Sequence, residues 1–203
     1  MRLINKNKEP KSLVEYRTKG GTFGDFSLDK GKRDLKNRLL SEQSFLCAYC
    51  TQSIKFETMK VEHWYPQSNP KQLSPNRDLD YSNLFAVCKG CFGHEEHCDT
   101  NKGNKIISIL PTDTNHIAQI YYKNGSINSI NTKHNQDLNC ILKLNINALV
   151  KQRKQVLSTF KLEIHKRYSG RRANFRQLLE NWKKKNIPHQ MVVVSYLEYK
   201  NRK

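Results

Sequence analysis

The sequence has no long apolar run and no apolar leader. Residues 1–10 are mostly polar and lack the apolar core of a secretory signal peptide. No stretch approaches the roughly 20 consecutive apolar residues that a membrane-spanning helix needs. These absences argue against secretion and against a membrane anchor, and we therefore predict a cytoplasmic protein.

Acidic and apolar residues are also scarce. The 203 residues include 18 Asp and Glu against 36 Lys and Arg, which gives a formal net charge of +18. A lysine surplus can simply keep a surface solvated, but one this large favours a polyanionic partner. Together with the motifs described below, it favours DNA or RNA over a membrane. Only 36% of the residues are hydrophobic, so a metal ion would help to hold a modest core together.

Six cysteines remain, and a reducing compartment makes disulfides between them rare. Four of them form two CxxC pairs, Cys47/Cys50 and Cys88/Cys91, which is the spacing of metal ligands. Four thiolates suit a closed tetrahedral zinc site with a structural role. Cys98 is an alternative ligand, but its spacing fits less well and we expect it to pack in the core. Cys140 lies among apolar residues, and we predict the same role for it.

Three regions are expected along the chain. Residues 1–30 are polar and glycine-rich and predict an N-terminal arm rather than a core. Residues 31–105 hold nearly all the cysteines and begin with a helical pattern from Gly31 to Phe45. Residues 106–203 predict a mainly helical C-terminal region.

Within the C-terminal region, residues 106–110 and 117–122 have the composition of short strands, and Asn124-Gly125 is typical of a hairpin turn. A long amphipathic helix follows, with apolar residues at three- and four-residue steps from Ile146 to Ile164. A second helix carries Phe175, Leu178, Leu179 and Trp182 on one face. Residues 191–197 form one more element, and periodicity does not decide between strand and helix.

The two cysteine pairs enclose an ordered set of motifs. In chain order these are Glu62-His63-Trp64-Tyr65-Pro66, Asn83-Leu84 before the second pair, and Asp99-Thr100-Asn101-Lys102 after it. This order resembles the HNH endonuclease family, and five pieces in sequence are far more specific than any one alone. The resemblance implies an α+β fold in which a ββα-metal HNH core carries the four-cysteine zinc site and is followed by the helical region.

A closer resemblance is to the small HNH subunit, PtuB, of Septu-type and retron-associated anti-phage systems. It extends to the N-terminal Lys-Glu-Pro-Lys-Ser-Leu segment and to Leu144-Asn145-Ile146-Asn147 before the long helix. These flanking matches are looser than the HNH motifs. The resemblance implies a partner ATPase of the ABC/SMC-like class, of PtuA type.

The chemistry of phosphodiester hydrolysis assigns roles to these residues. A largely neutral imidazole can accept a proton from water, and His63 is the predicted general base. The carboxylates of Glu62 and Asp99 offer the oxygen ligands that Mg²⁺ or Mn²⁺ prefers. Adjacent strand residues point to opposite faces, so the strand must end or twist near His63 if Glu62 is to share the site. By resemblance, Asn83 orients the segment that carries the base.

The third metal position departs from the family pattern, which usually has His or Asn where this chain has Asp99. His94, His97 and Asn101 therefore stay open as alternative ligands. Lys102 lies one helical turn beyond Asp99 and is expected to contact a phosphate. Arg171 and Arg172 follow a glycine and are expected at a helix entrance, where backbone N–H groups add phosphate affinity. Each of these basic residues could instead lie on a solvated face.

Taken together, these features predict a metal-dependent HNH endonuclease that hydrolyses nucleic-acid phosphodiester bonds, with DNA favoured over RNA. It would be the effector subunit of an anti-phage complex. Two alternatives stay open: a non-catalytic zinc-ribbon module that binds nucleic acid, and a scaffold for the ATPase. Cleavage that depends on His63 separates the first reading from the others.

Overall fold

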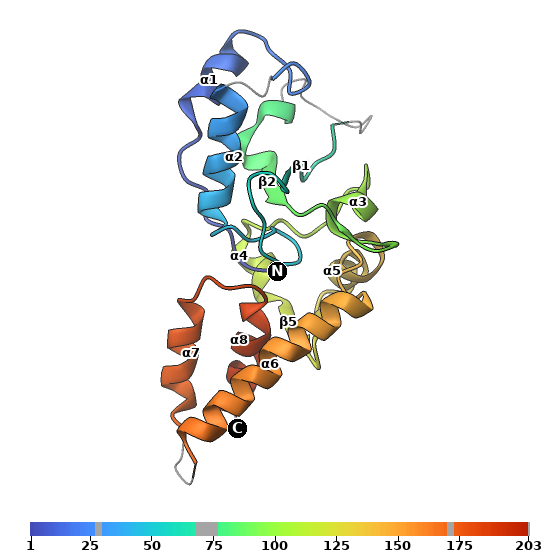
Figure 1. The fold of residues 1–203 in the computed structure, drawn as a ribbon. Helices are drawn as coiled ribbons and strands as arrows, with labels where there is room; N and C mark the ends of the chain where they lie inside the picture. Colours follow the sequence, from blue (N-terminus) through green and yellow to red (C-terminus); the bar gives the residue numbers. More distant parts are fainter. Residues whose placement is uncertain (27–29, 68–76, 170–172, 203) are drawn as a thin grey trace.

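The computed structural model describes residues 1–26, 30–67, 77–169 and 173–202. Helices and three two-stranded sheets alternate along these residues, as Figure 1 shows, which confirms a mixed helix and strand fold. None of the helices in the described ranges is both long and apolar enough to cross a membrane.

The first sheet pairs two strands that are far apart in the sequence. Strand β1 (Lys60–His63) runs antiparallel to β2 (Leu84–Val87), with Glu62 opposite Phe85 and His63 opposite Leu84. All four residues of β2 are buried, and helix α2 (Lys30–Glu42) packs against this strand. β1 ends at His63, in agreement with the expectation that the strand ends or twists near this residue. Two 3₁₀ turns, η1 (Arg77–Leu79) and η2 (Tyr81–Asn83), precede β2.

A tight hairpin follows the second cysteine pair. Strands β3 (Cys91–Phe92) and β4 (Glu95–Glu96) are antiparallel, and the short helix α3 (Cys98–Lys102) begins two residues later. The backbone N–H of His97 donates to the carbonyl of Gly90 over 2.8 Å. The hairpin therefore returns the start of α3 to the second cysteine pair.

The next hairpin confirms the turn at Asn124-Gly125. It joins β5 (Ile120–Lys123) to β6 (Ser126–Ser129), and both turn residues have positive φ. The expected strand at 106–110 is wrong, because these residues are irregular. The second expected strand starts later than 117, because Asp113 caps helix α4 (Thr114–Ala118) by accepting from two backbone N–H groups.

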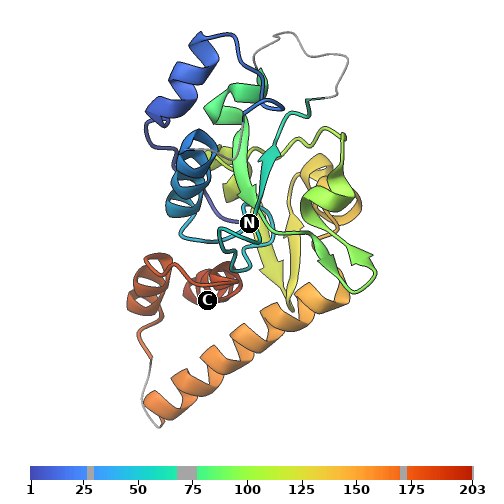
Figure 2. The same ribbon diagram turned by 45° about the horizontal axis from the view of Figure 1, so that its top comes forward.

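The C-terminal region is helical. It comprises α5 (Thr132–Gln136), the π-helical turn η3 (Asp137–Ile141), α6 (Asn147–Arg167), α7 (Phe175–Lys183) and α8 (Gln190–Asn201). The run of valines that periodicity left undecided is in α8, where three consecutive valines are buried. Figure 2 shows α6 extending along one side of the molecule, with α7 and α8 beside it.

The buried apolar side chains form two clusters that do not divide at residue 105. One extends from Met1 to Leu149 and the other from Phe160 to Leu197. Ile107, Ile109 and Ile127 pack in the first cluster with Leu35 and Leu39. The expected N-terminal arm also contributes buried residues (Met1, Ile4, Leu13 and Phe26) and forms helix α1 (Lys11–Thr18), so it belongs to the core. Apolar residues spaced through this polar segment are enough to anchor it.

Candidate active site and cysteine cluster

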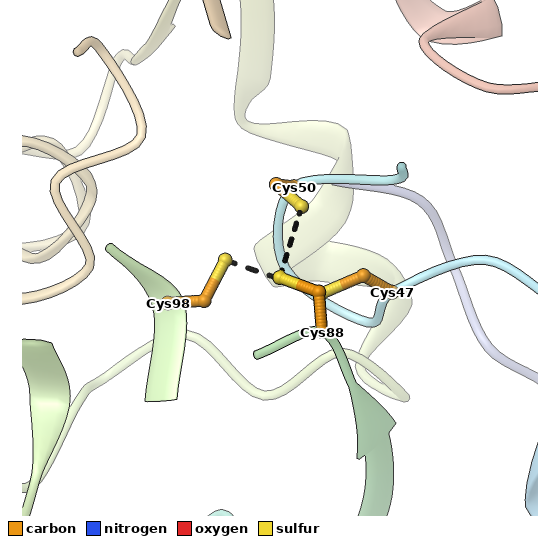
Figure 3. Close-up of side chains that lie close together, drawn as sticks. All are labelled: Cys47, Cys50, Cys88 and Cys98. Atoms are coloured by element: carbon orange, nitrogen blue, oxygen red, sulfur yellow. Dashed lines mark hydrogen bonds between the residues drawn. The ribbon is translucent and has the colours of Figure 1, made fainter. Parts of the chain in front are cut away.

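Four cysteines meet in one buried cluster. The Sγ atoms of Cys47, Cys50, Cys88 and Cys98 all lie within 4.8 Å of one another. Figure 3 shows the four side chains converging from three segments of the chain, and none is in a disulfide. This arrangement is compatible with a metal site.

Burial and mutual contact set the acidity of these thiols. Burial raises the pKa of Cys50 and of Cys98. Burial also opposes ionisation of Cys47, but hydrogen bonds with the neighbouring thiols outweigh it and hold the pKa of Cys47 well below its usual value. The cluster therefore favours at least one thiolate, which is the form that binds a metal.

The fourth member of the cluster differs from the one that the CxxC spacing predicts. Cys91, expected to complete it, is exposed on β3, whereas Cys98, expected to be a packing residue, has no exposed surface. Gly90 explains the exchange, because a Cβ at this position would lie 2.3 Å from the carbonyl oxygen of His97. The glycine lets the returning hairpin approach closely and delivers Cys98 to the cluster.

A second buried group lies beside the sheet. Oε1 of Glu62 is 2.7 Å from the ammonium of Lys102 and accepts a hydrogen bond from the hydroxyl of Tyr49 over 3.0 Å. Burial raises the pKa of Glu62 to about 8, and the nearby Asp99 carboxyl adds to this rise while Lys102 opposes it. The expected carboxylates, Glu62 and Asp99, are thus brought together between β1 and α3.

Lys102 departs from its expected role as a surface contact for phosphate. It is 1% exposed, and its ammonium also donates to the carbonyl of His63 over 3.1 Å. Lys102 lies on the side of α3 that faces β1, so its side chain is directed toward this strand rather than toward solvent. Lys60 is the more accessible cation here, 3.4 Å from a carboxylate oxygen of Asp99.

The imidazole of His63 has a fixed orientation. Its Nε2 lies 2.8 Å from the carbonyl oxygen of Asp78, and the ring of Phe23 meets it edge-on at 4.5 Å between centroids. A carbonyl can only accept, so Nε2 carries the proton and Nδ1 is the basic nitrogen. Burial lowers the pKa of His63, which keeps the ring neutral at neutral pH.

Asn83 holds the segment that follows His63. Its Oδ1 accepts from the backbone N–H of Tyr65 over 2.7 Å, and its Nδ2 donates to the carbonyl of Tyr65 over 3.1 Å. The carbonyl of Asn83 also accepts from the backbone N–H of Trp64. These three bonds fix the chain immediately after the strand.

The alternative metal ligands lie elsewhere. Asn101 donates to the carbonyls of Cys140 and Ile141, and His94 is exposed in the β3–β4 hairpin. His97 is buried beside the cysteines, with Nδ1 at 3.1 Å from Sγ of Cys98. Asp99 is the residue of this group that lies against Glu62.

Two residues that contact the candidate active-site residues, Tyr49 and Phe23, have no clear signal in the sequence. Tyr49 lies inside the first CxxC pair, and Phe23 lies in the glycine-rich segment expected to be an N-terminal arm. The CxxC motif leaves the residue type at position 49 unspecified, and Phe23 lies outside all of the motifs. Arg171 and Arg172, expected to contact nucleic acid, lie outside the described residues.

Comparison with known proteins finds relatives whose names agree with the family that the motifs resemble. The chain is 34% identical over 98 residues to "Retron Ec83 putative HNH endonuclease" of Escherichia coli, covering 44% of this chain and 38% of that protein. It is 31% identical over 115 residues to "Retron Vc95 putative HNH endonuclease" of Vibrio cholerae, covering 54% and 56%. It is 30% identical over 118 residues to "Septu protein PtuB" of Bacillus thuringiensis, covering 57% and 42%.

Other comparisons add little. No protein-family profile matches the chain. The Type II-C Cas9 enzyme from Actinomyces naeslundii aligns at 21% identity over 49% of this chain and 10% of that one, with a TM-score of 0.31, which is too low to show a shared fold. The chain spans 38 to 56% of the length of the three curated relatives. Over those segments, the relatives confirm that the chain resembles the putative HNH endonucleases of two retrons and is PtuB-like.

Proposed function

We propose that this protein is a metal-dependent HNH endonuclease that hydrolyses phosphodiester bonds, with DNA as the favoured substrate. The observation that carries this proposal is the orientation of His63. Its Nε2–H is held by the Asp78 carbonyl, and this leaves Nδ1 free to accept a proton. A general base with a fixed tautomer and a neutral ring at neutral pH is what proton abstraction from water requires.

The remaining residues position this base. Asn83 binds both backbone groups of Tyr65 and so fixes the chain beyond His63. Lys102 donates to the His63 carbonyl from the other side. Phe23 packs against the ring edge-on and limits its rotation. His63 would accept the proton of the attacking water at Nδ1, and these contacts would keep that nitrogen in place.

Glu62 and Asp99 fit a hard divalent cation such as Mg²⁺ or Mn²⁺. The two carboxyl groups lie together, and both described contacts of Glu62 with Tyr49 and Lys102 use Oε1. A bound cation would relieve the repulsion that contributes to the raised pKa of Glu62. When bound, such an ion supplies charge neutralisation at the phosphate and at the departing oxygen.

The cysteine cluster fits a structural zinc ion. Four thiolates around zinc at about 2.3 Å would place the sulfurs roughly 3.8 Å apart. The Cys47–Cys98 and Cys50–Cys88 sulfur pairs are 4.0 and 3.7 Å apart. We propose Cys98, rather than Cys91, as the fourth ligand of this zinc.

The curated relatives support a role in anti-phage defence, because two are named for retrons and one for Septu. We extend the proposal to an effector subunit that works with an ABC/SMC-like ATPase of PtuA type. The positive charge of the chain supports nucleic acid as its substrate.

A cleavage assay with His63→Ala tests the proposal. The parent and the variant would be incubated with DNA and with RNA, with and without the ATPase, in Mg²⁺, Mn²⁺ or chelator. We expect the variant to cleave about 100- to 10,000-fold more slowly, the usual contribution of a general base. His165→Ala is the matched control, since His165 is exposed on α6 and makes no described contact with the candidate active site.

Equal cleavage rates of the parent and His63→Ala would show that His63 is not the general base. If neither protein cleaves under any condition but both bind nucleic acid and zinc, the binding-module alternative is supported instead. A tight complex with the ATPase without cleavage or nucleic-acid binding would support the scaffold alternative. DNA and RNA tested in parallel separate the two substrates.

A further inference from the structure

 A groove lies outside the candidate active site, and none of the residues that line it belongs to that site or to the cysteine cluster. The groove's volume is about 910 Å³, within the range of roughly 300–1,000 Å³ typical of ligand clefts. It is formed by the β5–β6 hairpin, α6 and α8, and Figure 1 shows these elements in the lower half of the view, below α1 and β1.

Tyrosine rings line this groove from two elements. Tyr121 on β5 is 42% exposed and Tyr199 on α8 is 53% exposed. Strand alternation places Lys123 on the same face as Tyr121, and helical spacing places Tyr199 one turn beyond Ser195. Exposed aromatic rings beside a groove offer flat surfaces on which nucleic-acid bases stack.

The charge of the groove is strongly positive. Four cationic side chains line it (Lys123, Lys161, Lys200 and Arg202) against the single carboxylate of Glu198. Within the described ranges, none of these four cations has an ion-pair partner. Lys161 lies 4.9 Å from the centre of the Tyr196 ring, so positive charge and aromatic surface are interleaved.

We propose that this groove binds a single-stranded segment of nucleic acid, with bases on Tyr121 and Tyr199 and phosphates on the lysines. The proposal rests on the proposed function, because it assigns part of the substrate of the same nuclease to a second surface. A partner protein is the competing occupant. The excess of unpaired cations over carboxylates, combined with exposed tyrosines, favours nucleic acid.

The test measures binding without cleavage. Fluorescence anisotropy without added Mg²⁺ or Mn²⁺ would follow a labelled oligothymidylate and an oligouridylate, each about 12 nucleotides long, and a duplex of the same length. We expect Tyr121→Ala and Tyr199→Ala each to weaken single-strand binding about 5- to 150-fold, the range for loss of one stacked base. Tyr121→Phe is the matched control, because it keeps the ring and should bind as the parent does.

The lysines give an independent readout. Lys161→Gln and Lys200→Gln should each reduce the slope of log affinity against log salt by about 0.7, the value for one phosphate contact on a single strand. Zinc content and thermal unfolding of each variant would identify any loss of folding.

Single-strand binding that is unchanged in both alanine variants would overturn the proposal, as would a parent that binds the duplex equally well or binds no oligonucleotide. The nuclease proposal would survive that result if the parent cleaved nucleic acid and the His63→Ala variant did not. Conversely, loss of binding in the groove variants would support the groove even if no protein cleaved.

Discussion

The ammonium of Lys102 lies 2.7 Å from Oε1 of Glu62, and neither side chain is more than 5% exposed. Removing one partner from such a buried pair leaves an uncompensated charge, which typically costs about 3–5 kcal/mol. This pair ties helix α3 to strand β1, and it therefore connects the cysteine cluster to the candidate active site.

Lys102→Met should lower the free energy of unfolding by about 3–5 kcal/mol near pH 8.5, where Glu62 is largely ionised in the parent. The loss should be smaller near pH 6, because a protonated Glu62 needs no counter-charge. Urea unfolding at the two pH values measures both effects. The double variant Lys102→Met/Glu62→Gln should recover part of the loss, and no recovery would mean that the pair is not coupled.

Cys98→Ser should abolish zinc binding, whereas Cys91→Ser should leave it intact. The structure places Cys98 in the cluster and Cys91 on an exposed strand. Structural zinc contributes roughly 10–16 kcal/mol of apparent binding free energy, so its loss should also unfold the surrounding module. Metal analysis of both purified variants provides the measurement. The reverse pattern would restore the second CxxC pair as the ligand set.

Asn83→Ala should slow cleavage and destabilise the fold by about 1–3 kcal/mol. The substitution removes an acceptor from the Tyr65 N–H and a donor from the Tyr65 carbonyl. Thermal unfolding and single-turnover cleavage report the two effects separately. Ser82→Ala on the same 3₁₀ turn is a control, since Ser82 is exposed and bonds only to Asp80 in the described contacts. Normal cleavage by Asn83→Ala would remove its positioning role.

Phe23→Ala should raise the pKa of His63 toward its ordinary value. Burial is the largest cause of the lowered pKa, and the Phe23 ring is part of what covers the imidazole. NMR titration of the His63 ring would measure the change. Phe56→Ala is the control, because Phe56 contacts Lys36 rather than His63. An unchanged His63 titration would show that other groups exclude water from the ring.

Acidification should destabilise the protein through His189. Burial lowers the pKa of His189 to about 4, below the value near 6.5 of an unfolded chain. Above pH 6.5 both states are neutral at this residue, and as pH falls toward 4 the unfolded state binds a proton first. This linkage costs about 2 kcal/mol of stability between pH 7 and pH 5.

His189→Asn should lose less stability than the parent over that pH interval. Asparagine tolerates the left-handed backbone of His189, with φ of 55°, so the comparison adds little strain. Urea unfolding of both proteins at the two pH values gives the difference. An equal loss in the two proteins would assign the acid sensitivity to other groups.

Local sequence patterns predicted several elements of this protein. The spacing of Leu35 and Leu39 predicted helix α2, and Asn124-Gly125 predicted the β5–β6 hairpin. Both depend on neighbouring residues, through helical periodicity in one case and through positive φ in the other. Residues 106–110 show the limit of such reasoning, because a short apolar run is buried here without forming a strand.

The sequence by itself determined that this chain carries a cysteine cluster and an HNH-like order of motifs, since spacing and residue type suffice for both. Only the tertiary structure decided that Cys98, and not Cys91, lies in the cysteine cluster and that Lys102 points inward to Glu62. Both outcomes depend on the return of the β3–β4 hairpin against Gly90, a long-range backbone approach that no local pattern encodes.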